Sequence, residues 1–372
     1  MKRYFLLAAT VVAALPIIAA SAAIPETAAV NRGAAYLLTI QDSSGGYGAP
    51  SAGQAFDSIF AIRSAGLDPN KDVLPGGKTP ADYVKAQASA QTKPAAAAKA
   101  ALAARATGLD PKAVNGTNLI ANITAGLDAA TGKFASDDFS QSIAMLGLAC
   151  TGNSVPTNAV TALKGTQLKD GSWGFDGLGD PDTTAIAVQA LLAADTPKTD
   201  AAVAKAITLL KSTIGTDGGW GFDPTASNAS STAYVIQALI AAGEDLNVPQ
   251  YIRPGPSPVS FLLSQQNPDG SSIGFDPVYS TNQALPALAG RTFCDAPATP
   301  ITQVRPAPTP TPTPVRTATS TPVTPVSTSA PAPPSTGNSA GERERGAVPA
   351  LLVAAIGVLL GGAGAARIAR RG

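Results

Sequence analysis

Hydrophobic residues in the middle of this chain recur with helical spacing, in two alternating kinds of segment. In residues 201–212, Val203, Ile207 and Leu210 share one stripe, and the lysines and threonine of the segment fall off it. This pattern predicts an amphipathic helix with one face in water. Residues 184–194 are instead apolar nearly all round, which predicts a helix buried on most sides. Outer helices with one solvent-exposed face, paired with buried inner helices and arranged in a circle, predict an all-α fold, the α/α toroid or double-layered barrel.

A phrase of turn residues joins the two kinds of segment and returns about every 50 residues, as in a repeat array. Its Asp-Gly pair suits a tight turn, because glycine accepts a positive φ. Clear copies occupy residues 169–176 and 216–223, and a frayed copy at 268–276 has Ile273 in the tryptophan position. Three weaker units bring the expected total to about six helical hairpins: the copies around Tyr47 and Phe134, and residues 81–109, which lost the phrase.

Residues shared by the copies are expected to serve the fold, and a residue present in one copy is a better site candidate. Asp176, Asp223 and Asp276 recur at one place in the phrase and are interpreted as structural. Trp173 and Trp220 are expected to pack where one unit meets the next. A functional site should therefore lie where the copies differ, at the starts of the inner helices.

The phrase also carries a family resemblance. Residues 167–174 read Gln-Leu-Lys-Asp-Gly-Ser-Trp-Gly, which resembles the QW motif of squalene and oxidosqualene cyclases. The wider prenyltransferase/squalene-oxidase repeat family implies an α/α toroid over most of residues 24–296. A weaker likeness joins residues 142–150 to inner helices of the cobalamin carriers transcobalamin and intrinsic factor, secreted toroids that bind without catalysis. The β domain of those carriers is not visible in this sequence.

One segment resembles a catalytic motif of that family. Residues 180–185 read Asp-Pro-Asp-Thr-Thr-Ala, close to the Asp-x-Asp-Asp-Thr-Ala of triterpene cyclases. The resemblance implies that Asp182 is the acid that protonates an alkene or epoxide, with Asp180 as its neighbour. Burial and a second carboxylate would raise the pKa of that acid. Thr183 stands where the family has its last Asp, and those cyclases use two barrels where this chain has room for one.

The same residues have a structural interpretation. When the inner helices are aligned, Asp182 falls on Ser230, and every unit offers Ser, Thr, Asn or Asp where its inner helix begins. Such residues cap helices by accepting bonds from free backbone N–H groups, and a carboxylate there suits the helix dipole. The sequence leaves acid and cap open, with the cap favoured for Asp182.

Other chemistries are excluded by the residues available. The chain has no histidine and two cysteines that are not clustered, so neither the zinc site of protein prenyltransferases nor a Ser-His-Asp triad can be built. We expect no metal and no cofactor. A formal net charge of +1, with no long basic run in the domain, argues against nucleic acid as a partner.

The inner rim offers polar side chains that could hydrogen-bond a ligand, although each could equally be satisfied within the fold. These candidate ligand-binding residues are Gln54, Gln141, Tyr234, Tyr279 and Asn282. Cys150 and Cys294 lie in what reads as a secreted chain, so they form either one disulfide or two buried thiols.

The two ends of the chain predict a surface location. Residues 1–23 have a basic start, an apolar run and a small-x-small site near Ala22, as a cleaved signal peptide does; a retained anchor is the alternative. Residues 297–346 are rich in Pro, Thr and Ser and predict an extended disordered stalk. Residues 347–366 carry no charge and are long enough for a transmembrane helix, and the basic tail 367–372 places that end in the cytoplasm.

A short string before the predicted membrane helix resembles a sortase sorting signal, whose pattern is Leu-Pro-x-Thr-Gly. Pro334, Thr336 and Gly337 match the pattern, but Pro333 stands where leucine is expected. The resemblance implies attachment to the cell wall, and the alternative is a linker that contains the string by chance.

These observations favour a surface-anchored α/α toroid on a stalk that binds, without catalysis, a small hydrophobic or corrinoid-like ligand or a surface partner. The alternative is a terpene cyclase-like enzyme of the squalene type with Asp182 as protonating acid. A third class is a purely structural surface protein, and the ligand itself cannot be identified from the sequence.

Overall fold

The computed structural model describes residues 24–48, 51–71, 76–223, 225–246, 251, 256–274 and 276–295. The chain divides into two units, residues 1–305 and 306–372, and every described residue belongs to the first. The predicted signal peptide, stalk, sorting motif and membrane helix lie outside the described residues. Within those residues, no helix has both the length and the apolar character needed to cross a bilayer.

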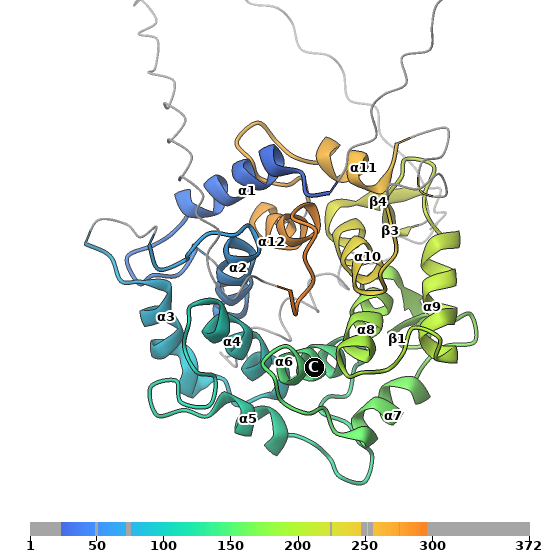
Figure 1. The fold of residues 1–372 in the computed structure, drawn as a ribbon, viewed down its shortest axis with the longest axis horizontal. Coiled ribbons are helices and arrows are strands. Elements are labelled where there is room, and N and C mark those ends of the chain that lie inside the picture. Colours follow the sequence, from blue (N-terminus) through green and yellow to red (C-terminus); the bar gives the residue numbers. More distant parts are fainter. Residues whose placement is uncertain are drawn as a thin grey trace, which may run out of the picture. The chain divides into compact units, whose positions relative to one another are not determined.

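The described residues form two concentric rings of helices (Figure 1). Each inner helix packs against the next, and the last packs against the first, so the inner ring is closed. The expected α/α toroid is therefore confirmed. The inner helices are α2 (Ala52–Ser64), α4 (Pro94–Ala106), α6 (Asp138–Ala149), α8 (Pro181–Ala193), α10 (Ala229–Ala241) and α12 (Pro277–Leu288). The outer helices are α1 (Thr27–Thr39), α3 (Pro80–Gln87), α5 (Leu119–Ala125), α7 (Thr157–Gly165), α9 (Ala201–Ser212) and α11 (Pro258–Ser264).

Burial follows the hydrophobic pattern of each ring. The outer helix α9 buries Val203, Ala206, Ile207 and Leu210, which is the stripe that its sequence predicts. The inner helix α8 buries an unbroken run from Asp182 to Leu191. An inner helix has neighbours on both sides, the outer ring behind it and the barrel interior in front, so it has no face left for water.

The turn phrase fastens each unit to the next outer helix. Gly171, Gly218 and Gly270 all have positive φ, and a Cβ on Gly270 would overlap the carbonyl oxygen of Arg32 in α1. The amide of Gln167 donates to the carbonyl oxygen of Ala202 at the start of α9, at 2.8 Å. Only glycine fits both the backbone angle and the close approach, so the phrase is a packing device between neighbouring units.

Both tryptophans of the phrase have a structural role, because each donates a hydrogen bond to the preceding outer helix. Trp173 Nε1 donates to Leu163 O at 2.7 Å, and Trp220 Nε1 donates to Leu210 O at 2.8 Å. From each tryptophan onward the chain forms a short antiparallel hairpin, which the sequence analysis did not predict. One hairpin pairs β1 (Trp173–Phe175) with β2 (Leu178–Asp180), and the other pairs β3 (Trp220–Asp223) with β4 (Ala226–Asn228).

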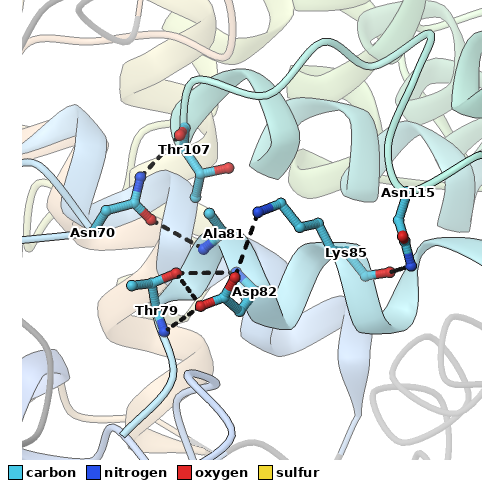
Figure 2. A network of polar contacts seen from close by, with 7 residues as sticks. All are labelled: Asn70, Thr79, Ala81, Asp82, Lys85, Thr107 and Asn115. Atoms are coloured by element: carbon cyan, nitrogen blue, oxygen red, sulfur yellow. Dashed lines mark hydrogen bonds and ion pairs between the residues drawn. The ribbon is translucent and has the colours of Figure 1, made fainter. Parts of the chain in front are cut away.

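The unit that lost the phrase uses a polar network in its place (Figure 2). Thr79 and Asp82 form a reciprocal capping box at the start of α3. The side chain of Asn70 bridges two elements, because Nδ2 donates to Thr107 O and Oδ1 accepts from Ala81 N. A 3-10 turn, η1 (Ala88–Ala90), then leads toward α4.

Candidate functional site

The two carboxylates of the cyclase-like motif lie at the start of α8 and differ in role. Asp180 is the N-cap, and its Oδ1 accepts a bond from Thr183 N at 2.7 Å. Asn228 holds the same place in α10, where its Oδ1 accepts from Ser231 N at 2.9 Å. The capping interpretation of Asp182 is therefore wrong. Asp180, two residues earlier, caps the helix, and Asp182 does not.

Asp182 is a buried carboxyl with an unused oxygen. Its Oδ1 is buried and has no hydrogen-bond partner among the described groups. Burial raises the pKa of Asp182 to about 7, the charge of Asp180 adds to the rise, and the Ser231 hydroxyl opposes it. A carboxyl with this pKa is about half protonated at neutral pH and can give up a proton there.

Aromatic side chains stand beside this carboxyl. The hydroxyl oxygens of Tyr234 in α10 and Tyr279 in α12 lie 3.2 Å apart. Burial raises the pKa of the Tyr279 phenol, and the charge of Asp182 raises it further, so both tyrosines stay neutral. The ring of Phe139 meets the ring of Tyr234 edge-on at 6.0 Å. Aromatic faces attract positive charge, so this part of the interior can stabilise a cation.

A buried ion pair, which sequence reasoning missed, lies between two neighbouring inner helices. Lys99 Nζ in α4 is 2.6 Å from Asp57 Oδ2 in α2, and the two side chains are 9% and 13% exposed. Burial raises the pKa of Asp57, while Lys99 opposes the rise. The charge of Asp57 also acts on both tyrosines. The available signal was a lysine in the middle of the alanine-rich run 94–106, where Arg105 near the end is the other charged residue.

A small cavity lies among some of these side chains. Its volume is about 10 Å³, and Asp57, Lys99, Tyr234, Gln237 and Asn282 are among the residues that line it. A water molecule needs roughly 10–15 Å³ by the same measure. This cavity therefore has room for one water, and not for a larger molecule.

The five candidate ligand-binding residues separate into two groups. Tyr234, Tyr279, Asn282 and Gln54 come together: Asn282 Nδ2 donates to Gln54 O at 3.3 Å, and Gln54 Nε2 donates to the α12 cap, Asp276, at 2.9 Å. Gln141 lies apart, because its side chain bonds the turn that precedes α6.

Three bonds hold the Gln141 side chain in that position. Its Oε1 accepts from Phe134 N at 2.6 Å, and its Nε2 donates to Gly132 O at 3.1 Å and to Ala159 O at 3.3 Å. These bonds satisfy the amide locally. Across the described part of the chain, no cluster of three or more His, Cys, Asp or Glu side chains is placed to hold a metal ion.

Cys150 and Cys294 form a disulfide. Cys150 is the C-cap of α6, and Cys294 follows α12, which stands opposite α6 in the order of the inner ring. The bond therefore ties the segment after the last helix across one end of the barrel.

A second hollow lies on the surface between the two hairpins. Its volume is about 170 Å³, and its lining includes Asp170, Asp180, Trp220 and Phe222. The Phe222 side chain is 44% exposed there. This groove combines carboxylates with an exposed aromatic ring, but it is formed largely by the structural phrase.

Comparison with known proteins agrees with this architecture. Residues 113–286 match the family model of the squalene-hopene cyclase C-terminal domain. The matched range includes Asp180, Asp182, Tyr234 and Tyr279, and it excludes the Asp57–Lys99 pair. A search of curated proteins gave no significant match.

Several solved structures are similar to this chain. The type II terpene cyclase MstE from Scytonema is 14% identical, with a TM-score of 0.52 over 71% of this chain and 97% of that chain. A protein from Actinoplanes is 17% identical, with a TM-score of 0.47 over 71% and 98%. The ent-copalyl diphosphate synthase from Streptomyces platensis is 20% identical, with a TM-score of 0.39 over 70% and 50%. The last two scores are too low to carry an argument.

The fold and the matched segment define the class: this is a toroid with a terpene cyclase-like fold. The resemblance to the squalene cyclase repeat family is confirmed. The likeness to cobalamin carriers found no support in these comparisons, nor did the likeness to a sorting signal, which lies outside the described residues.

Proposed function

We propose that this protein is a terpene cyclase-like enzyme in which Asp182 protonates a carbon–carbon double bond or an epoxide of an isoprenoid. The observation that supports it best is the state of Asp182: buried, with one oxygen unpartnered and its pKa raised to about 7. Asp182 also lies within the range that matches the squalene-hopene cyclase domain. A capping role does not account for this side chain, because Asp180 fills it.

The first step would use the residues around Asp182 as follows. The proton leaves the carboxyl oxygen and bonds to one alkene carbon, the π electron pair forms the new C–H bond, and the neighbouring carbon becomes cationic. The faces of Tyr234, Tyr279 and Phe139 then stabilise that cation. Burial raises the pKa of Asp180, and the N–H bond that it accepts from Thr183 opposes the rise; in its charged form Asp180 favours a protonated Asp182 before the next turnover.

A single toroid is compatible with this proposal. The type II terpene cyclase MstE is matched over 97% of its own chain, so a cyclase of that kind has a similar extent. The cavity of about 10 Å³ does not have Asp182 among its lining residues, so its volume does not describe the space beside this carboxyl.

The test is incubation of the full-length chain with squalene and shorter polyprenyl substrates, followed by chromatography of the products. We expect a cyclised product whose rate of formation falls about a hundredfold or more in Asp182→Asn, the range of a lost general acid. Asp180→Asn is the matched control, since asparagine caps as well as aspartate. It removes the neighbouring charge, so the pH range of activity should move downward. Equal product from wild type and Asp182→Asn would reject the proposal.

A second candidate function is a non-catalytic binding module at the cell surface. The surface groove between the hairpins favours it, because this hollow is larger than the inner cavity and carries an exposed aromatic ring. It predicts no cyclised product and a rise in melting temperature with one class among corrinoids, isoprenoids and glycans, because a ligand that binds only the folded state stabilises it. Asp182→Asn should leave that rise unchanged.

A further inference from the structure

The cavity in the middle of the ring is lined by hydrogen-bond acceptors that lack donors. Gln237 Nε2 donates to Gln283 O at 3.1 Å, and Asn282 Nδ2 donates to Gln54 O at 3.3 Å. These bonds fix the orientation of both amides, and they leave Gln237 Oε1 and Asn282 Oδ1 buried without a partner. Buried acceptors in native proteins are almost always paired with a protein group or a water, so a donor in this cavity, from a water or from a ligand, would complete both amides.

The segment after α12 closes this cavity from the end where the inner helices finish. It runs inward toward the middle of the ring (Figure 1). Phe293 is buried, lines the cavity and stacks on Phe60, with ring centroids 5.3 Å apart and planes 13° from parallel. The next residue, Cys294, is fixed by its disulfide to Cys150 and by Arg105 Nη1, which donates to Cys294 O at 3.1 Å.

We propose that residues 290–295 are a plug in a ligand site at this end of the barrel, with the Phe293 ring in the place of the ligand's own apolar ring. The ligand class follows from the lining. A flat apolar group would stack on Phe60, and a hydrogen-bond donor would meet the carbonyl oxygens of Gln237 and Asn282. The segment is neither helix nor strand. Its first residues, Gly290 and Arg291, donate backbone hydrogen bonds to α12, and further along it is attached by the disulfide, the ring contact and the hydrogen bond to the carbonyl oxygen of Cys294.

The ligand should be neutral. Lys99 and Asp57 also line the cavity, and at 2.6 Å they neutralise each other. A charged ligand would bring an unpaired charge into a buried site, which costs far more than a neutral donor does.

The size of the site limits the ligand to one ring. With Phe293 in place the cavity is about 10 Å³, whereas a cavity of about 150 Å³ can hold benzene. Removal of one aromatic ring therefore creates room for a single-ring molecule.

The probe for this site is phenol, which combines one apolar ring with one neutral donor, and toluene is the probe without a donor. Binding is measured by ligand-observed NMR and by the melting temperature of the full-length chain. We expect no binding of either probe to the wild type. Phe293→Ala, with its disulfide intact, should bind phenol about tenfold more tightly than toluene, the value of one hydrogen bond. Adding Gln237→Leu and Asn282→Leu should remove that preference.

Two further variants make the result specific. Phe261→Ala removes a buried ring from α11 in the outer layer, and it should show no preference for phenol. Replacing both cysteines by alanine should free the plug and allow phenol to bind while Phe293 is retained, provided that circular dichroism shows a folded toroid. Phe293→Ala that binds neither probe, or binds both equally, overturns the site. Phenol binding to the wild type as tight as to Phe293→Ala overturns the plug.

This inference goes beyond the cyclase proposal and does not depend on it. Asp182 is not among the residues that line the cavity, so Asp182→Asn combined with Phe293→Ala should bind phenol as Phe293→Ala does. A failure of the phenol experiment therefore leaves the cyclisation experiment unaffected, and the reverse also holds.

Discussion

At the scale of single residues, two adjacent carboxylates of one motif have acquired different physical tasks. Asp180 accepts a hydrogen bond from a backbone N–H and so caps the helix, which gives its carboxyl group a structural role. Asp182, two residues on, has lost water without gaining a full set of partners, and its pKa is raised to about 7 for that reason. A residue that costs stability and serves no packing need is a candidate for chemistry.

The cost of Asp182 should be visible in the pH dependence of stability. The folded chain binds this proton up to about pH 7, but the unfolded chain releases it near 3.8, so the free energy of unfolding should fall as pH rises between these values. In Asp182→Asn the free energy of unfolding should fall less over this pH range, by on the order of 1–4 kcal/mol. The stability of the variant relative to wild type should therefore be greatest at pH 8. Urea unfolding at pH 5 and pH 8 measures both values. A variant whose loss with pH equals that of the wild type would contradict the burial argument.

At the scale of elements, the repeated phrase is a joint between units. Its glycine, tryptophan and glutamine each contact the backbone of another element, which explains why they recur. The frayed copy keeps the joint that matters most. Gln266 Nε2 donates to Ala29 O at 2.9 Å, so the last unit is fastened to α1 and the ring closes.

Two glycines with similar backbone angles allow the cost of the close approach between units to be separated from the cost of a positive φ. Gly270 has φ 93° and lies against the backbone of Arg32, whereas Gly177 has φ 78° and nothing within 4 Å of a built Cβ. Gly177→Ala should cost about 1–2 kcal/mol from the backbone angle alone. Gly270→Ala should cost clearly more, because α1 must also move. Thermal unfolding of the two variants gives the comparison, and equal losses would show that the close approach does not matter.

At the scale of the whole molecule, the toroid is one part of a longer chain. The predicted signal peptide, stalk and membrane helix still rest on composition, since they lie outside the described residues. We propose on that basis that the toroid is displayed on the outer side of a membrane. In this proposal the chain is anchored in the membrane by its predicted C-terminal helix. Attachment to the cell wall is a further candidate, through the sorting-like residues Pro334, Thr336 and Gly337.

Display on a stalk predicts a defined pattern of proteolysis. Protease added to intact cells should release a fragment that contains the whole toroid, because a Pro- and Thr-rich stretch is exposed and a packed repeat domain is not. The fragment is detected by an antibody to the toroid. Thr336→Ala should leave the chain in the membrane fraction and remove any cell-wall fraction. A toroid that becomes protease-accessible only after lysis would refute surface display.

Much of the toroid could be predicted from the sequence, but the contents of its interior could not. Helical periodicity and a repeated turn are local patterns, so they revealed the pairs of helices and their number. The acid candidate came from a motif of six residues. The ion pair of Asp57 and Lys99 joins two units that share no motif, so no pattern along the chain connects its members. The capping error arose because the start of a helix is uncertain by one or two residues in sequence.

Hydrophobic spacing and glycine turns act over a few residues, so they are enough to predict that this chain forms a ring of helical hairpins. What the ring encloses follows from contacts between distant units. Closing the ring brings α12 against α2 and joins Cys150 to Cys294 across 144 residues. It also leaves Asp182 buried, forms a cavity of about 10 Å³ between distant units and places Phe293 on Phe60. Burial and interior volume depend on residues brought together from distant units, and no local pattern records them.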